Sequence, residues 1–125
     1  MSPRESPATT NELARIALLK GLPGETLGRL ARVMVREDVA AGASVVREGE
    51  PGERFYVVLS GLFAVSQADL GPRRVLRPGD YFGEVALAMS IPRTASVRAL
   101  TPAVVASCGQ ETFDELLRPL FADED

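Results

Sequence analysis

Between Val33 and Cys108 the chain alternates between short apolar segments and clusters of turn residues. The segments are rich in β-branched and aromatic residues, and glycine, proline, serine or aspartate stands between them. Many short strands at this spacing indicate a barrel or a double-sheet jelly roll. We expect strands over residues 33–39, 44–47, 54–59, 62–66, 73–76, 95–100 and 103–108.

The two ends of the chain show helical periodicity instead. Apolar residues recur at helical spacing from Asn11, which can cap a helix, up to Gly21, and a second short amphipathic run follows Pro23. A closing helix is expected from about residue 110 to 118, where Pro119 and the acidic residues after it end the helix. The predicted fold class is therefore α+β, an antiparallel double-sheet β-roll with N-terminal helices and one C-terminal helix.

The length of 125 residues and the hydrophobic fraction of 46% fit one domain with a single core. We expect residues 1–9 to be a disordered leader, residues 10–120 to form the domain and residues 121–125 to be an acidic tail. No secretory signal or membrane span is visible, and the lone cysteine, Cys108, allows no internal disulfide. These features predict a cytoplasmic protein with no membrane partner.

Composition argues against several functions. The chain has no histidine and one cysteine, so Ser-His-Asp hydrolysis, Cys-His hydrolysis and a transition-metal site are not expected. The net charge of -3 disfavours a polyanion, so nucleic acid is not an expected partner. An enzyme such as a phosphodiesterase is disfavoured as well, because no cluster of carboxylates has metal-ligand spacing. We therefore expect a non-catalytic protein with no metal and no cofactor.

Residues 81–96 do not fit the strand rhythm. This segment opens on an aromatic pair and Gly83, continues with about one and a half turns of good helix formers and ends on Pro-Arg-Thr-Ala. A short helix between two strands leaves free backbone N–H groups at its start, around Gly83 to Ala86, where an anion can bind. Glu84 can accept hydrogen bonds from a diol, and Arg93 can close on the same anion. This combination suits a singly charged phosphodiester on a ribose.

The alternative interpretation of the same residues is purely structural. Glu84 and Arg93 would then form an ion pair that brackets a loop, and Phe82 and Leu87 would be ordinary core residues. Residue types alone leave both interpretations open.

Two longer patterns contain this segment. The downstream pattern runs from Phe82 to Ala99 and reads FGExAL, five residues, then RTAxVxA. The upstream pattern runs from Val45 to Gly61 and reads VVxxGExGxxFYVVxxG, with glycines that we interpret as turn formers. In this order and separation the two patterns resemble the cyclic nucleotide-binding domain, which is shared by cAMP-dependent kinase regulatory subunits, catabolite activator proteins and cyclic nucleotide-gated channels. The likeness extends from about residue 11 to residue 120.

The resemblance implies ligand-binding roles for ten residues: Phe82, Gly83, Glu84, Val85, Ala86, Leu87, Arg93, Thr94, Ala95 and Val75. Glu84 would bind the ribose 2′-OH and Arg93 the exocyclic phosphate oxygens, while the backbone N–H groups of residues 83–87 would hold the rest of the phosphate. Thr94 and Ala95 would touch the phosphate from the opposite side. Val75 and Phe82 would line the base and the sugar.

The function that this resemblance implies is a regulatory module that binds cAMP, or else cGMP, without catalysis. A hydroxyl residue at the position of Thr94 is associated in the family with cGMP, whereas family frequency favours cAMP. The second hypothesis is a structural or protein-interaction β-roll that no longer binds nucleotide.

Members of the family usually continue past the closing helix into a lid helix over the base. Only about seven residues follow Arg118 and they include an acidic run, so we expect neither a lid helix nor an effector segment. The base would then be partly exposed, or a protein partner, a second copy of the chain or the N-terminal helix would supply the cover and the output.

Overall fold

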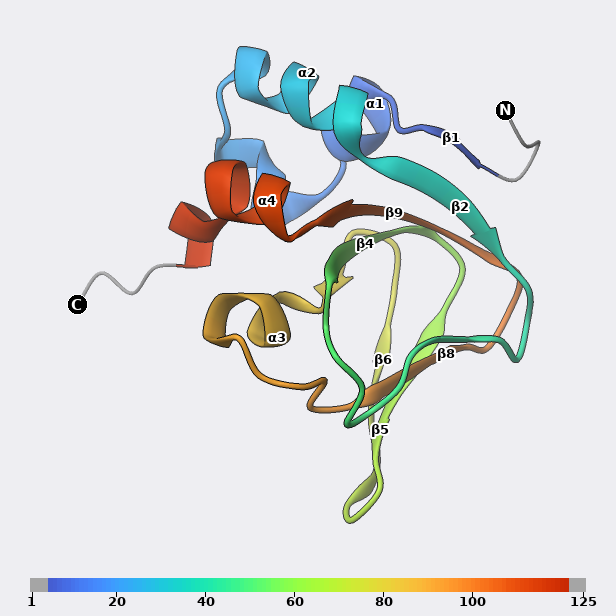
Figure 1. Ribbon diagram of the computed structural model, residues 1–125. Helices are drawn as coiled ribbons and strands as arrows, with labels where there is room; N and C mark the ends of the chain where they lie inside the picture. Colours follow the sequence, from blue (N-terminus) through green and yellow to red (C-terminus); the bar gives the residue numbers. More distant parts are fainter. Residues whose placement is uncertain (1–4, 122–125) are drawn as a thin grey trace.

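The computed structural model describes residues 5–121, which form two antiparallel sheets with helices at both ends of the sequence (Figure 1). The first sheet has the strand order β1 (Glu5–Pro7), β2 (Val35–Val39), β9 (Ala103–Gly109), β4 (Arg54–Ser60) and β7 (Tyr81–Phe82). The second sheet has the order β3 (Ser44–Val46), β8 (Ser96–Ala99), β5 (Phe63–Gln67) and β6 (Gly71–Leu76). This arrangement confirms the predicted α+β double-sheet β-roll.

Two strands of the first sheet were not predicted, and one of them corrects the domain boundaries. β1 pairs with β2 in antiparallel register, and the Ala8 N–H donates to the Met34 carbonyl at 3.2 Å. The disordered leader predicted for residues 1–9 is therefore wrong for residues 5–9, and residues 1–4 lie outside the described residues. Backbone pairing explains the difference, because the edge of β2 needs hydrogen-bond partners whatever side chains the partner strand carries.

The first helix begins earlier than predicted. α1 (Thr10–Leu13) is capped by Thr9 rather than by Asn11. The Thr9 hydroxyl accepts from the Glu12 N–H at 3.1 Å, and the Glu12 carboxylate accepts from the Thr9 N–H at 3.0 Å. This reciprocal pair satisfies donors that the first helical turn leaves free.

The single helix predicted up to Gly21 is also wrong, because the backbone is extended at Ile16. A 3₁₀ turn (Ala17–Gly21) follows, and then α2 (Gly24–Val33), which confirms the second amphipathic run. The break at Ile16 turns three apolar side chains into the core, where each is at most 1% exposed: Leu13, Ile16 and Leu19.

The closing helix continues past its predicted end. α4 (Gln110–Thr112) runs on through a π-helical turn (Phe113–Leu117) and a 3₁₀ turn (Arg118–Phe121). Pro119 does not end the helix. It lies in the first turn of a new helical segment, where a backbone N–H would have no hydrogen-bond partner, so the missing N–H of proline costs nothing. Phe121, which was assigned to an acidic tail, belongs to this turn, and residues 122–125 lie outside the described residues.

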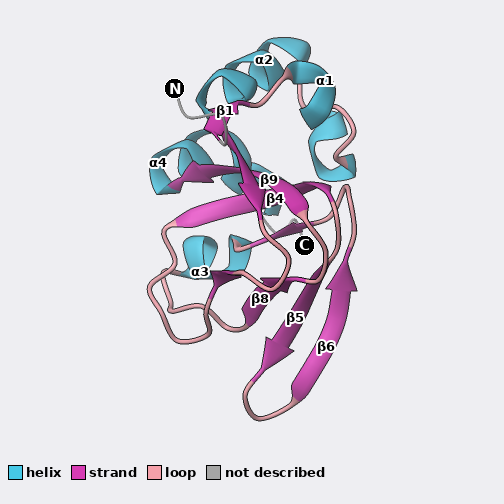
Figure 2. Ribbon diagram, turned by 90° about the vertical axis from the view of Figure 1, so that its right-hand side faces the viewer, coloured by secondary structure: helices cyan, strands magenta, loops and turns pink. Residues whose placement is uncertain are grey.

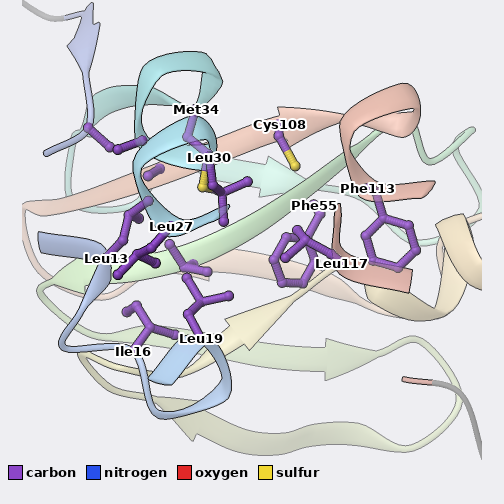
Figure 3. Close-up of a cluster of buried hydrophobic side chains, with 14 of the residues drawn as sticks. Leu13, Ile16, Leu19, Leu27, Leu30, Met34, Phe55, Cys108, Phe113 and Leu117 are labelled. Atoms are coloured by element: carbon purple, nitrogen blue, oxygen red, sulfur yellow. The ribbon is translucent and has the colours of Figure 1, made fainter. Parts of the chain in front are cut away.

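Two hydrophobic clusters share the central strands. One lies between the helices and the first sheet and includes Leu30, Phe55 and Phe113 (Figure 3). The other fills the roll and includes Val58 and Val105. Strand β4 sends Phe55 into the first cluster and Val58 into the second. Burial on both faces explains why β4 and β9 read as continuous apolar runs rather than as alternating ones.

The helices divide between the two faces of β4. Figure 2 shows α1 and α2 stacked at one end of the molecule, with the β5–β6 hairpin projecting at the other end. The short α3 (Glu84–Met89) lies on the opposite side of β4 from α2, where it faces the roll (Figures 1 and 2). Within residues 5–121, no helix combines the length and the apolar character needed to span a bilayer.

Candidate functional site

The turn from β7 into α3 is built on a glycine. Gly83 is the N-cap of α3 and has a φ of 97°, in the left-handed region that side chains disfavour. A Cβ at this position would also lie 2.8 Å from Nη1 of Arg93 and 2.9 Å from the carbonyl oxygen of Arg54. Only glycine therefore fits here, and its absent side chain lets Arg93 approach the start of the helix.

A cavity of about 200 Å³ opens between the start of α3 and the inner face of the second sheet. Its volume is several times the roughly 30 Å³ that one water molecule occupies in the liquid. It brings together most of the predicted site residues: Phe82, Gly83, Glu84, Val85, Ala86, Arg93, Thr94 and Ala95.

Arg93 is the central charged group of this cavity, with only 7% of its surface exposed. Its Nη2 donates to the Arg54 carbonyl at 2.8 Å, its Nη1 donates to the Gly83 carbonyl at 3.3 Å, and its guanidinium lies 5.9 Å from the centroid of the Tyr56 ring. Burial lowers the pKa of Arg93, and the neighbouring Tyr56 is the largest opposing influence. An arginine nevertheless stays protonated in proteins.

The structural alternative for Glu84 and Arg93 does not hold in this structure. No ion pair joins them, or Arg93 to any other carboxylate, within the part of the chain that the structure describes. A buried charge is normally paired, because removing it from water is costly. Arg93 is instead a buried cation that holds backbone carbonyls and faces an open cavity.

Glu84 occupies the first turn of α3 and lines the same cavity. Among the side chains that the structure describes, none donates a hydrogen bond to its carboxylate, and Glu84 is only partly buried. Its oxygens are therefore available to accept hydrogen bonds from a ligand.

The upstream pattern forms the wall behind Arg93. The Gly49 N–H donates to the Arg93 carbonyl at 2.9 Å, and the Arg93 N–H donates to the Glu50 carbonyl at 2.8 Å. A Cβ at Gly52 would lie 2.5 Å from the Cβ of Ala86 and 3.1 Å from Cζ of Arg93. The two sequence patterns therefore build one site: the upstream loop contacts the backbone and the guanidinium of Arg93, which belongs to the downstream pattern.

The structure does not bring two of the predicted residues into the cavity. The strand register sets Val65 opposite Arg74 and Ala64 opposite Val75, so Arg74 and Val75 lie on opposite faces of β6. Arg74 is exposed, yet it lines the cavity. Val75 is 38% exposed and does not line the cavity. The Leu87 side chain is fully buried in the cluster beneath the helices, so only its backbone can take the predicted role.

Sequence reasoning missed five lining residues: Val46, Val65, Arg74, Tyr81 and Val97. Strand parity could have found Arg74, because it lies two positions before the buried Leu76 and so shares its face. The remaining four needed knowledge of which strands face α3 across the roll.

A sequence model described as the cyclic nucleotide-binding domain matches residues 36–119. The match covers more than half of the chain and contains every residue that lines the cavity. The chain belongs to the cyclic nucleotide-binding domain family.

Several curated relatives of this domain are named as regulatory subunits of a protein kinase. The cAMP-dependent protein kinase regulatory subunit of Candida albicans is 41% identical over 108 residues, which are 86% of this chain and 24% of the relative. The domain thus spans about a quarter of the length of the curated relatives that it matches first. These relatives are named as regulatory subunits, which agrees with the prediction of a regulatory domain.

Two solved structures show the same fold. The regulatory domain of Toxoplasma gondii PKA with cAMP has a TM-score of 0.83 at 31% identity, covering 90% of this domain and 45% of that chain. The regulatory subunit of a cAMP-independent protein kinase A from Trypanosoma brucei has a TM-score of 0.84 at 28% identity, and the match covers 88% of this domain and 40% of that chain.

Proposed function

We propose that this cyclic nucleotide-binding domain binds a cyclic nucleotide and acts as a regulatory module. One observation carries the proposal: Arg93 is a buried cation without a carboxylate partner in the described structure, and it lines the same cavity as the start of α3 and Glu84. A singly charged phosphodiester would supply the missing negative charge, and an attached ribose would meet Glu84.

The arginine retains donors for such a ligand. A guanidinium has five N–H groups, and the contacts to Gly83 and Arg54 use two of them. The remaining donors and the free N–H groups at the start of α3 would bind the phosphate oxygens, and the Glu84 carboxylate would accept from the 2′-OH. Val65 and Val97 would form an apolar wall for the sugar and base.

The base is a separate question, with two candidate ligands. The relatives named as cAMP-dependent support cAMP. Arg74 supports cGMP, because it lines the cavity and has no hydrogen bond or ion pair within the described residues. Guanine presents two acceptors, O6 and N7, to a forked guanidinium, whereas adenine presents one acceptor and one donor. Thr94 lines the same cavity, and its hydroxyl can add a further contact.

Sharing the fold is not enough to assign cAMP as the ligand of this chain, since the similar Trypanosoma brucei protein is named as cAMP-independent. The test is calorimetry with cAMP, cGMP and cyclic di-GMP. Arg93→Ala should cost about 2–5 kcal/mol of binding, a loss of about 30-fold to several thousand-fold in affinity. Arg98→Ala is the matched control, because Arg98 is exposed on β8 and does not line the cavity.

Glu84→Gln provides a second variant in case Arg93→Ala fails to fold, and it should weaken binding while circular dichroism stays unchanged. Absence of binding to all three nucleotides by the folded wild-type protein would instead support a β-roll that serves structure or protein interaction. Equal affinity of Arg93→Ala and wild type would refute the assigned role of the arginine.

We also propose that the output of the module is a contact with a protein partner in the cytoplasm. The similarity to kinase regulatory subunits makes a kinase catalytic subunit the first candidate for this partner. Retention of such a subunit on the immobilised domain, with and without nucleotide, is the direct measurement.

A further inference from the structure

The β5–β6 hairpin supplies two residues that line the cavity, Val65 on β5 and Arg74 on β6. Strand β5 also pairs with β8, and this pairing ends where Ser66 lies opposite Ser96. Beyond that pair the hairpin projects from the second sheet (Figure 2), and ladder hydrogen bonds to β8 no longer hold it. Whatever fixes the hairpin there also fixes one wall of the cavity.

Gln67 makes the next contact along the hairpin. Its Nε2 donates to the Thr94 carbonyl at 2.9 Å. Gln67 shares a face of β5 with Val65 and the buried Phe63, because side chains two positions apart point to the same side of a strand. A carbonyl oxygen accepts only from the NH₂ group of an amide, which fixes the orientation of this side chain. Gln67 therefore joins the hairpin to the segment that follows Arg93.

Glu48 ties the hairpin to the same region a second time. Its carboxylate accepts from the Ala68 N–H at 2.8 Å, and its own N–H donates to the Ser96 hydroxyl at 2.9 Å. We call these two hydrogen bonds and the bond from Gln67 to Thr94 the hairpin clasp. The clasp begins where the pairing of β5 with β8 ends, and it holds the hairpin in place of further ladder hydrogen bonds.

The clasp is separate from the contacts that hold Arg93. The backbone and the guanidinium of Arg93 are held by the upstream loop, residues 49–54, and by the Gly83 carbonyl. None of these contacts involves the hairpin. Loss of the bond between Gln67 and Thr94 should therefore leave the arginine in place and change the spacing between Thr94 and the hairpin.

The groups available to a base lie on the two elements that the clasp joins. Arg74 belongs to the hairpin, Thr94 belongs to the loop before β8, and both line the cavity. Under the proposed function the phosphate meets Arg93, whereas the base meets Arg74 and Thr94. A side chain that sets the spacing of these last two residues acts on the base and not on the phosphate.

We infer that Gln67 is a positioning residue that sets the base preference of the cavity by fixing the distance between the β5–β6 hairpin and Thr94. The inference rests on the proposed nucleotide binding. Gln67 is not among the residues that line the cavity. It acts through the hairpin and through Thr94, without touching the ligand.

The test compares Gln67→Met with Ser66→Ala. Methionine is an unbranched side chain of similar length without an amide donor, so the substitution removes the hydrogen bond and keeps most of the packing. Ser66 is the matched control, because it precedes Gln67 on β5, points to the opposite face and does not line the cavity. Gln67→Met should lower the ratio of cGMP affinity to cAMP affinity by about 3–10-fold, the equivalent of one ordinary hydrogen bond. Ser66→Ala should leave this ratio within about twofold of the wild-type value.

Titration calorimetry with cAMP and cGMP, with competition for the weaker ligand, measures the ratio. A merely structural role would lower both affinities together, so a ratio that stays unchanged or rises in Gln67→Met would overturn the inference. Gln67→Glu provides a second variant in case Gln67→Met fails to fold. It sets an acceptor against the Thr94 carbonyl and should lower the ratio as well. A wild-type ratio in Gln67→Glu would also overturn the inference.

If wild type binds neither nucleotide, the proposed function fails, and amide hydrogen exchange in the free protein still decides whether Gln67 holds the hairpin. The N–H groups of Glu48 and Ala68 belong to the clasp. Neighbouring contacts open as cooperative units, so both groups should exchange faster in Gln67→Met than in Ser66→Ala. The same exchange rates in the two variants would refute the positioning role on its own.

Discussion

Gly52→Ala tests the contact between the two sequence patterns. Ordinary van der Waals contact of a Cβ begins at 3.4 Å, and the added methyl would lie 2.5 Å from the Cβ of Ala86, which is short by about 0.9 Å. Gly52 is not in the left-handed region, so the substitution adds crowding without backbone strain. Either α3 or the Arg93 side chain must move.

Crowding of a packed site costs about 1–3 kcal/mol, which for a domain of this size lowers the melting temperature by about 4–12 °C. Nucleotide affinity should fall as well, because both groups that could move line the cavity. Differential scanning calorimetry and titration calorimetry measure the two effects on the same samples.

Ala86→Gly removes the other methyl and makes a double-mutant cycle possible. Alone it should cost about 0.5–1 kcal/mol as a glycine inside a helix. Combined with Gly52→Ala it should recover at least about 1 kcal/mol relative to the sum of the single changes, because residues in contact do not act additively. Additive costs would refute the reasoning, since the two methyl groups would then not compete for one space.

Three further predictions follow from the cavity and the core. Arg74→Ala should weaken cGMP binding by about 1–3 kcal/mol and cAMP binding by less, with Val75→Ala on the outer face of the same strand as control; equal losses for both nucleotides would contradict a guanine contact. Burial raises the pKa of Cys108 from 9.0 to about 11, so the thiol loses its proton at lower pH in the unfolded protein than in the folded one. The free energy of unfolding should therefore fall between pH 9 and 11 relative to that of Cys108→Ala, and parallel curves of unfolding free energy against pH would contradict this. Phe121→Ala should destabilise the domain by about 1–3 kcal/mol through its contacts with Tyr81 and Phe113, measured by urea unfolding, and no change would show that the last turn is not docked.

The structure also explains why the two sequence patterns occur together. The upstream loop bonds the backbone of Arg93 on both sides, at Gly49 and Glu50, and leaves space for α3 at Gly52. The Arg54 carbonyl then accepts a hydrogen bond from the Arg93 guanidinium. The site is therefore a property of both segments and cannot be transferred by the downstream pattern alone.

Local physics made much of the fold readable from the chain. Turn residues between short apolar runs predicted most of the strands, and helix formers after Gly83 predicted α3. The residues of the proposed anion site could be found for the same reason, since a glycine, a carboxylate and an arginine around a short helix lie within 11 residues of one another. Such features depend on neighbours in sequence.

Tertiary structure decided what depends on distant partners. β1 pairs with the edge of β2, although the sequence of β1 shows no strand pattern. The register of β5 and β6 places Arg74 rather than Val75 at the cavity. Arg93 donates to the Arg54 carbonyl, 39 residues away in sequence, and forms no ion pair with Glu84 in the described structure. Residue types and spacing determine which groups can form a site, whereas long-range packing determines which of them remain free to bind a ligand.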